Sequence, residues 1–217
     1  MSTQTITIGT RSYTLVTMPA SPGPASIQIT MIDTVAVVAS PFTRDEDVQL
    51  WPGGDAWGAT FTMPPMQDEH AWRWEAFLAA LQGRANVFQL GDPRKAVPRG
   101  LPLGSPVVDS SSSANNLPMT TTLTTRGWQA SAFRLLLPGD HIQIGYRLHM
   151  VTSLVNSTST GAAVFSVWPS IRETPADGTT ILCRSPVGLF RLADNRRGYQ
   201  SAPARGTTLS LPAMEAK

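Results

Sequence analysis

Short segments in which apolar and polar residues alternate recur along this chain, and clusters of turn-forming residues separate them. Residues 5–9 (TITIG), 12–17 (SYTLVT) and 26–38 (SIQITMIDTVAVV) form the first group. A period of two is typical of strands that bury one face, and Gly and Pro mark the turns between them. Residues 47–63 are expected to form a further strand pair, with the Pro-Gly-Gly sequence at 52–54 as its turn. The pattern predicts antiparallel sheets rather than a helical bundle.

One stretch has the period of a helix instead. Residues 68–82 follow two prolines, begin with Asp68 and Glu69, which suit the positive end of a helix dipole, and precede Gly83, which can close the helix. We expect this helix to lie on a sheet, while Trp72 faces the margin of the contact or a partner. Four apolar residues fall at spacings of three and four and form its inward stripe: Trp74, Phe77, Leu78 and Leu81.

The second half of the chain predicts a separate domain. Residues 93–106 contain four prolines without any period, and a polar run rich in serine follows. Five short strand candidates at roughly ten-residue spacing then lie between residues 133 and 184, a pattern typical of a small, OB-like barrel. The fold class expected is mainly β with one α-helix. A sandwich-like domain of residues 1–92 plus 186–217 would carry the helix, and a small β-barrel of residues 93–185 would be inserted into it.

Charge and composition argue against sequence-specific nucleic-acid binding and against a membrane span. The net charge is only +2, and the basic residues are scattered apart from Arg191, Arg196 and Arg197. Such a distribution argues against sequence-specific nucleic-acid binding, so Arg196 and Arg197 are candidates for a solvated loop or an interface with an acidic partner. The sequence has no apolar run of about 18 residues, and we expect no membrane span. A lone cysteine suggests synthesis in a reducing compartment.

Two histidines in residues 139–152 (GDHIQIGYRLHMVT) raise the question of a metal site. A two-residue turn would place Ile142 opposite His149, mixing apolar and polar residues on one face, whereas a three-residue loop gives a uniformly apolar face. Register follows the buried face, so the three-residue loop is predicted, with His141 and His149 pointing outward and no metal bound. The hairpin face expected in the barrel core consists of Ile142, Ile144, Leu148 and Met150.

No recognised catalytic motif accompanies the other reactive residues. Asp45, Glu46 and Asp47 form an acidic cluster, and Cys183 could act as a nucleophile only if the fold brought a histidine close. A hydrolase using these residues is the least favoured hypothesis, and we predict neither an enzyme nor a bound cofactor or metal. The six tryptophans keep open an alternative function, a carbohydrate-binding module for host adsorption.

Several passages resemble one family. Residues 69–93 (EHAWRWEAFLAALQGRANVFQLGDP) are similar to a helix-and-strand passage of tail-tip proteins from long non-contractile-tailed, siphovirus-type phages. Residues 124–128 (TTRGW), 136–152 (LLPGDHIQIGYRLHMVT), 164–181 (VFSVWPSIRETPADGTTI) and 186–195 (PVGLFRLADN) resemble the continuation of the same proteins. The resemblance spans residues 50 to 195 and is to distal tail proteins or related minor tail proteins.

That resemblance implies a structural role in the virion. A distal tail protein forms a hexameric ring that joins the tail tube to the tail-tip hub or baseplate, with a belt domain in the ring and a second β-domain facing outward. The expected partners are further copies of the chain, the tail tube protein, the hub protein and the tape measure protein. The protein would be made in the host cytoplasm and reside at the virion tail tip. Residues 18–26 and 93–106 are candidates for arms that lie on neighbouring subunits.

Overall fold

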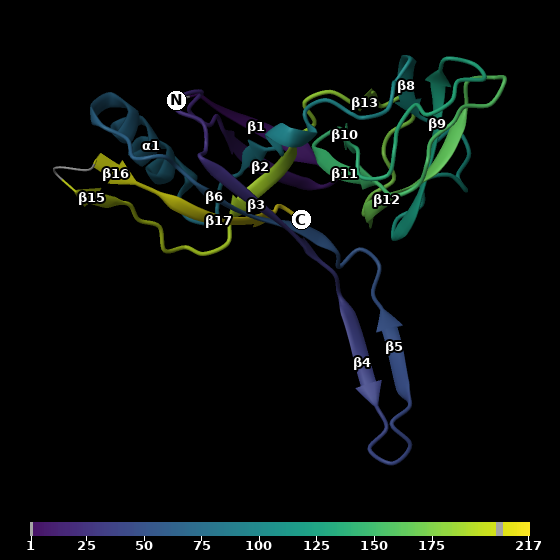
Figure 1. The fold of residues 1–217 in the computed structure, drawn as a ribbon, viewed down its shortest axis with the longest axis horizontal. Coiled ribbons are helices and arrows are strands. Elements are labelled where there is room, and N and C mark those ends of the chain that lie inside the picture. The colour runs from purple at the N-terminus through teal and green to yellow at the C-terminus, as the bar shows by residue number, and fades with distance from the viewer. Residues whose placement is uncertain (1, 203–205) are drawn as a thin grey trace.

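The computed structural model describes residues 2–202 and 206–217, and within them it confirms a mainly β fold with one α-helix and a nearly closed barrel-like sheet. Two bodies lie side by side, and a thin two-stranded ribbon projects away from them (Figure 1). A short 3-10 helix, η1 (Pro93–Lys95), stands between the two bodies in the sequence.

The first body is built on a five-stranded antiparallel sheet. Its strands follow the order β3 (Ser26–Ile32), β6 (Ala56–Thr62), β17 (Ser210–Glu215), β14 (Gly188–Leu192) and β7 (Phe88–Leu90). A hairpin of β1 (Thr3–Ile8) and β2 (Arg11–Val16) joins its edge through a bridge between Leu15 and Val87. A small hairpin of β15 (Gln200–Ala202) and β16 (Gly206–Thr208) extends beside the helix.

Helix α1 (Asp68–Leu81) covers this sheet, as its apolar stripe predicts. Trp74, Phe77, Leu78 and Leu81 are all buried and share one core with the sheet. The ring of Phe77 lies edge-on to that of Phe88, with 5.7 Å between centroids. Gln82 and Gly83, both with positive φ, end the helix in the left-handed conformation.

The second body is a six-stranded sheet that curls into a nearly closed barrel. Its order is β13 (Ile181–Leu182), β10 (His141–Ile144), β11 (Arg147–Val151), β12 (Ala163–Ile171), β9 (Thr120–Trp128) and β8 (Gly104–Val108). The two edges meet where the Val108 amide donates to the Thr179 carbonyl at 2.8 Å. Of the five strands expected here, residues 133–137 form only an isolated bridge, between Leu136 and Val155.

All strands of the barrel sheet come from residues 93–185, and all strands of the five-stranded sheet come from residues 1–92 and 186–217. The strand assignments are therefore compatible with a barrel inserted into a first domain. The division into these two domains stays a prediction.

The register of the β10–β11 hairpin differs from the predicted one. Ile142 pairs with His149 and Ile144 with Arg147, so the loop has two residues, and Gly145 occupies its first position with φ 57°. Glycine at that position is typical of a type II′ turn. The prediction was wrong because it assumed one buried face, whereas both faces of this hairpin are covered. The four predicted hairpin residues divide between two cores: Ile142 and Ile144 lie in the barrel core, while Leu148 and the partly buried Met150 pack into the core beneath the helix.

The strand pairing predicted for residues 47–63 is also wrong. β6 pairs with β3, and β5 (Glu46–Leu50) pairs with β4 (Val35–Ala39). Residues 26–62 therefore form one long ribbon whose turn lies at residues 40–45, and residues 51–55 interrupt its returning strand. The outer part of this ribbon, residues 35–50, is the projection seen in Figure 1 and is called the arm below.

Candidate assembly interface

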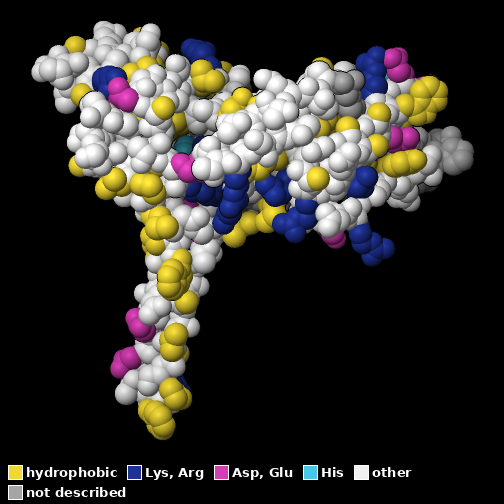
Figure 2. Space-filling model, turned by 180° about the vertical axis from the view of Figure 1, so that it is seen from behind, with side chains coloured by type: hydrophobic (Ala, Val, Ile, Leu, Met, Phe, Trp, Pro, Cys, Tyr) yellow, Lys and Arg dark blue, Asp and Glu magenta, His cyan; other side chains and the backbone are white. Residues whose placement is uncertain are grey.

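The arm presents one apolar face. Along it, Val35 lies opposite Leu50 and Val37 lies opposite Val48, while the other face pairs Ala36 with Gln49 and Val38 with Asp47. The four side chains of the apolar face remain 46–65% exposed. Hydrophobic side chains follow the arm along much of its length in the space-filling view (Figure 2).

Such a ribbon is unusual for the surface of a monomer. An isolated two-stranded hairpin is marginally stable in water, and its open strand edges invite pairing with other chains. Complete burial of a Val or Leu side chain contributes about 1.5–3 kcal/mol, so covering four half-exposed ones adds roughly 1 kcal/mol each. Covering the apolar face of the arm would therefore be energetically favourable.

The tip of the arm combines an aromatic ring with negative charge. Phe42 is 94% exposed, and Asp45, Glu46 and Asp47 follow it in the sequence and are also exposed. Ser40 fixes the loop, because its hydroxyl accepts from the amides of Phe42 and Thr43 and its own amide donates to the Asp45 carbonyl. The carboxylates considered under the least favoured hypothesis, a hydrolase, therefore lie in solvent at the end of a projection.

The root of the arm is held firmly against the barrel. Asp55, which is buried, accepts from the Gly53 amide at 3.0 Å and from the Ser170 hydroxyl at 2.6 Å. Burial by itself would raise the pKa of the Asp55 carboxyl, but hydrogen bonds, chiefly from Ser170, together with the charge of Arg172 outweigh it and hold the pKa below its ordinary value. Trp168 adds a second tie, since its indole donates to the Asp33 carboxylate at 2.8 Å.

Positive charge gathers beside this root. Figure 2 shows Lys and Arg side chains grouped on the body next to the arm. A cavity of about 460 Å³ there is lined by the arm-root residues Pro52 and Gly53, by apolar side chains such as Met119, and by four cationic residues: Arg11, Arg147, Arg172 and Lys217. We call this cavity the root cavity.

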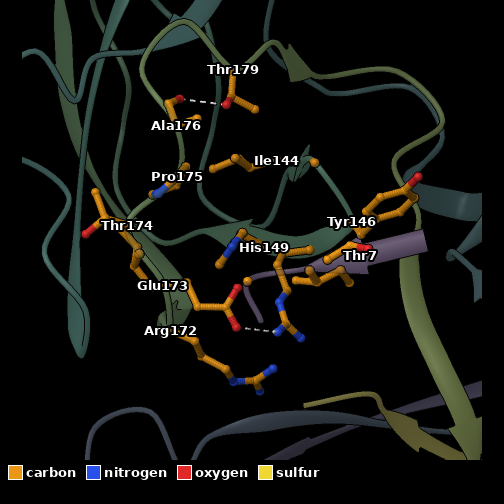
Figure 3. Close-up of a pocket in the computed structure, with 15 residues that line it drawn as sticks. Thr7, Ile144, Tyr146, His149, Arg172, Glu173, Thr174, Pro175, Ala176 and Thr179 are labelled. Atoms are coloured by element: carbon orange, nitrogen blue, oxygen red, sulfur yellow. Dashed lines mark hydrogen bonds and ion pairs between the residues drawn. The ribbon is translucent and has the colours of Figure 1, made fainter. Parts of the chain in front are cut away.

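Two of these cations are neutralised within the protein. Arg172 forms a bidentate pair with the buried Glu215 (2.9 and 3.0 Å), and Arg147 pairs with Glu173 at 3.1 Å. Glu173 also lines an adjoining pocket, to which His149 contributes (Figure 3). Arg11 instead donates to the main-chain oxygen of Lys217, and the Lys217 ammonium donates to the main-chain oxygen of Gly54. Among the described residues, neither cation pairs with an Asp or Glu side chain.

The two histidines of the β10–β11 hairpin are buried, contrary to the prediction that they face outward. His141 is 4% exposed and packs its ring against Trp57, and burial lowers its pKa to about 4. His149 is 6% exposed, and its Nδ1 lies 2.9 Å from the Pro169 carbonyl oxygen. Within residues 2–202 and 206–217, no group of three His, Cys, Asp or Glu side chains is arranged to hold a metal ion.

Cys183 lies in the barrel core and is 8% exposed. Burial raises the pKa of its thiol to about 12, so the thiolate needed for nucleophilic attack is scarce at neutral pH. Cys183 therefore packs as a core residue and is poorly suited to act as a nucleophile.

Of the residues expected at an interface, Trp72 is 66% exposed on α1, and Arg196 and Arg197 are exposed in the segment after β14. Trp51, at the arm root, is the other exposed tryptophan among the six, all of which the structure describes.

Sequence reasoning missed the arm itself. Its signals were the unusual length of the 26–38 strand pattern and the run of turn-forming residues at 40–45.

No model of a known protein family matches the chain, and a search of curated proteins found no similar sequence. Within the described residues, no helix has both the length and the apolar character required to cross a membrane.

Proposed function

We propose that this protein is a structural subunit of a phage tail tip, which assembles with copies of itself through the arm into a ring between the tail tube and the tail-tip hub. The observation that carries this proposal is the apolar face of the arm, formed by Val35, Val37, Val48 and Leu50. An enzyme or a monomeric binding module has no evident need for such a projection.

The arrangement favours a ring over a two-fold dimer. A subunit that offers a projecting arm on one side and a receiving surface elsewhere makes a heterologous contact, and heterologous contacts close into rings when the rotation between subunits allows it. The hexameric number, the position at the virion tail tip and the partners (tail tube, hub and tape measure proteins) rest on the sequence resemblance.

The test is assembly of the purified full chain, followed by light scattering and electron microscopy of negatively stained particles. We expect rings for the natural sequence and monomers for Val37→Ser combined with Val48→Ser. Val164→Ser is the matched control, because Val164 is 63% exposed on β12, away from the arm, and this variant should assemble normally. A natural protein that stays monomeric at high concentration, or an arm variant that still forms rings, would refute the proposal.

A further inference from the structure

We propose that the tip of the arm of one subunit inserts into the root cavity of the next, with Phe42 as the apolar anchor and Asp45 to Asp47 facing Arg11 and Lys217. This inference rests on the proposed function, since it names the receiving surface for the arm. The partner is therefore a second copy of the chain.

The arm cannot reach the root cavity of its own subunit. Asp45 and Pro52 are seven positions apart along mostly extended chain, which spans about 24 Å at roughly 3.4 Å per position. The arm points away from the body (Figure 1), and its root is fixed by the Asp55 and Trp168 hydrogen bonds. Tip and cavity of one subunit are thus held apart, and each is available to a neighbour.

The charges of the two surfaces are complementary. The tip carries three carboxylates against the single cation Arg44. Counting side chains, the root cavity carries four cations against one lining carboxylate, Glu173, and the buried Glu215 behind it balances one more. Arg11 and Lys217 are the two cations of the cavity that no Asp or Glu side chain of the described residues pairs with, although Arg11 also donates to the main-chain oxygen of Lys217. At physiological salt their charges act over about 8 Å, so they favour an acidic partner that is in contact.

The shapes of the apolar parts also correspond. Phe42 stands out from the tip at 94% exposure, and a large exposed aromatic is the kind of residue that dominates binding when it enters a pocket on a partner. The root cavity offers apolar surface from Ile8, Pro52 and Met119, and Met119 is itself 64% exposed. Its volume of about 460 Å³ is ample for one phenyl ring.

This contact is directional. Each subunit gives one tip and receives one tip, so each tip and each root cavity is used once. A series of such contacts leaves no unfilled cavity only when it closes into a ring. Because the receiving cavity lies at the root of the next arm, the successive arms would form a continuous belt in which each arm is laid against its neighbour.

Charge reversal tests the contact. The tip variant carries Asp45→Lys and Asp47→Lys, and the root variant carries Arg11→Glu and Lys217→Glu. Each alone places like charges together and should weaken association about tenfold or more. An equimolar mixture should recover assembly, because lysine tips then meet glutamate cavities while natural tips meet natural cavities. Arg134→Glu with Arg184→Glu is the matched control, since it changes net charge equally at exposed sites outside the cavity and should leave assembly intact.

Phe42→Ser provides a second variant that leaves charge unchanged, and we expect it to weaken association by a similar factor. Tip and root variants that assemble as well as the natural protein, or a mixture that fails to recover, would overturn the inference. If the Val37→Ser, Val48→Ser variant nevertheless remains monomeric, the arm still drives assembly and only its docking site is wrong. A natural protein that never assembles would overturn both proposals.

Discussion

The indole of Trp57 donates a hydrogen bond from Nε1 to the main-chain oxygen of Leu148, at 2.9 Å. Trp57 belongs to β6 of the five-stranded sheet, and Leu148 belongs to β11 of the barrel. Since Trp57 is only 1% exposed, this bond joins the two bodies at a place that water does not reach.

Replacing Trp57 by Phe should therefore destabilise the fold by about 2–4 kcal/mol, because the carbonyl of Leu148 loses its partner and a void replaces part of the indole. Urea denaturation followed by circular dichroism measures the change. Trp72→Phe is the control at an exposed site and should change the free energy of unfolding by less than about 0.5 kcal/mol. Equal effects of the two substitutions would contradict the structure.

The Arg172–Glu215 ion pair is a second contact between the two bodies, and its contribution to stability can be measured. Both side chains are at least 90% buried, and Arg172 also donates to the main-chain oxygen of Asp55. Glu215→Gln should cost about 3–5 kcal/mol, because it leaves a buried guanidinium without its counter-charge. The exposed pair Glu69–Arg73 on α1 is the control, and Glu69→Gln should cost about 0.5 kcal/mol or less. A small effect at Glu215 would show that water reaches the pair.

Asp140 organises the entry to the barrel. Its carboxylate accepts from the amides of Leu137 (2.8 Å), Arg99 (2.9 Å) and Gly100 (3.1 Å), and the side chain is 2% exposed. Asp140→Ala should lower the free energy of unfolding by about 2–4 kcal/mol, and Asp140→Asn, which keeps one acceptor oxygen, by about half as much. Asp92→Ala removes a similar but exposed bond to the Arg94 amide and should cost less than about 1 kcal/mol. Thermal denaturation of the three variants measures these losses. A larger loss in Asp92→Ala than in Asp140→Ala would mean that the Asp140 hydrogen bonds are absent.

Stability should fall as the pH decreases from about 6.5 to 4. Burial lowers the pKa of His141 to about 4, so in this window the unfolded chain binds a proton that the folded chain does not. The loss reaches about 3 kcal/mol at pH 4 and disappears above pH 6.5, and burial of His149 acts in the same direction. His141→Gln should flatten the dependence of unfolding free energy on pH.

The third histidine, His70, is exposed on α1, so His70→Gln is the control for replacing a histidine by glutamine. It should change the free energy of unfolding at pH 7 by less than about 0.5 kcal/mol. The lowered pKa values of Asp55 and Asp140 affect stability chiefly below pH 4, so they do not obscure the measurement. An unchanged slope in His141→Gln would mean that this side chain is reached by solvent.

The helix and the barrel strands could be predicted because their signals are local. The stripe formed by Trp74, Phe77, Leu78 and Leu81 has one buried side, and the burial of all four follows from the 3.6-residue period. The short alternating segments likewise identify most strands of the barrel, whichever strands they later pair with.

Pairing could not be predicted where the signals depend on the rest of the fold. The β10–β11 register was inferred from a single buried face, but the two cores cover both faces, and the turn preference of Gly145 decides the register. The arm was missed because Pro52, Gly53 and Gly54 resemble a hairpin turn, whereas they lie at a bend that returns the ribbon to the body.

The hairpin shared between two cores has a consequence for how the protein unfolds. Ile142 and Ile144 complete one core, and Leu148 completes the other, so neither core can lose its packing without exposing part of the other. The barrel and the helix-bearing sheet should therefore melt as one cooperative unit despite their separate sheets. Calorimetry would then give equal calorimetric and van't Hoff enthalpies, and a resolved double transition would show that the hairpin belongs to one part alone.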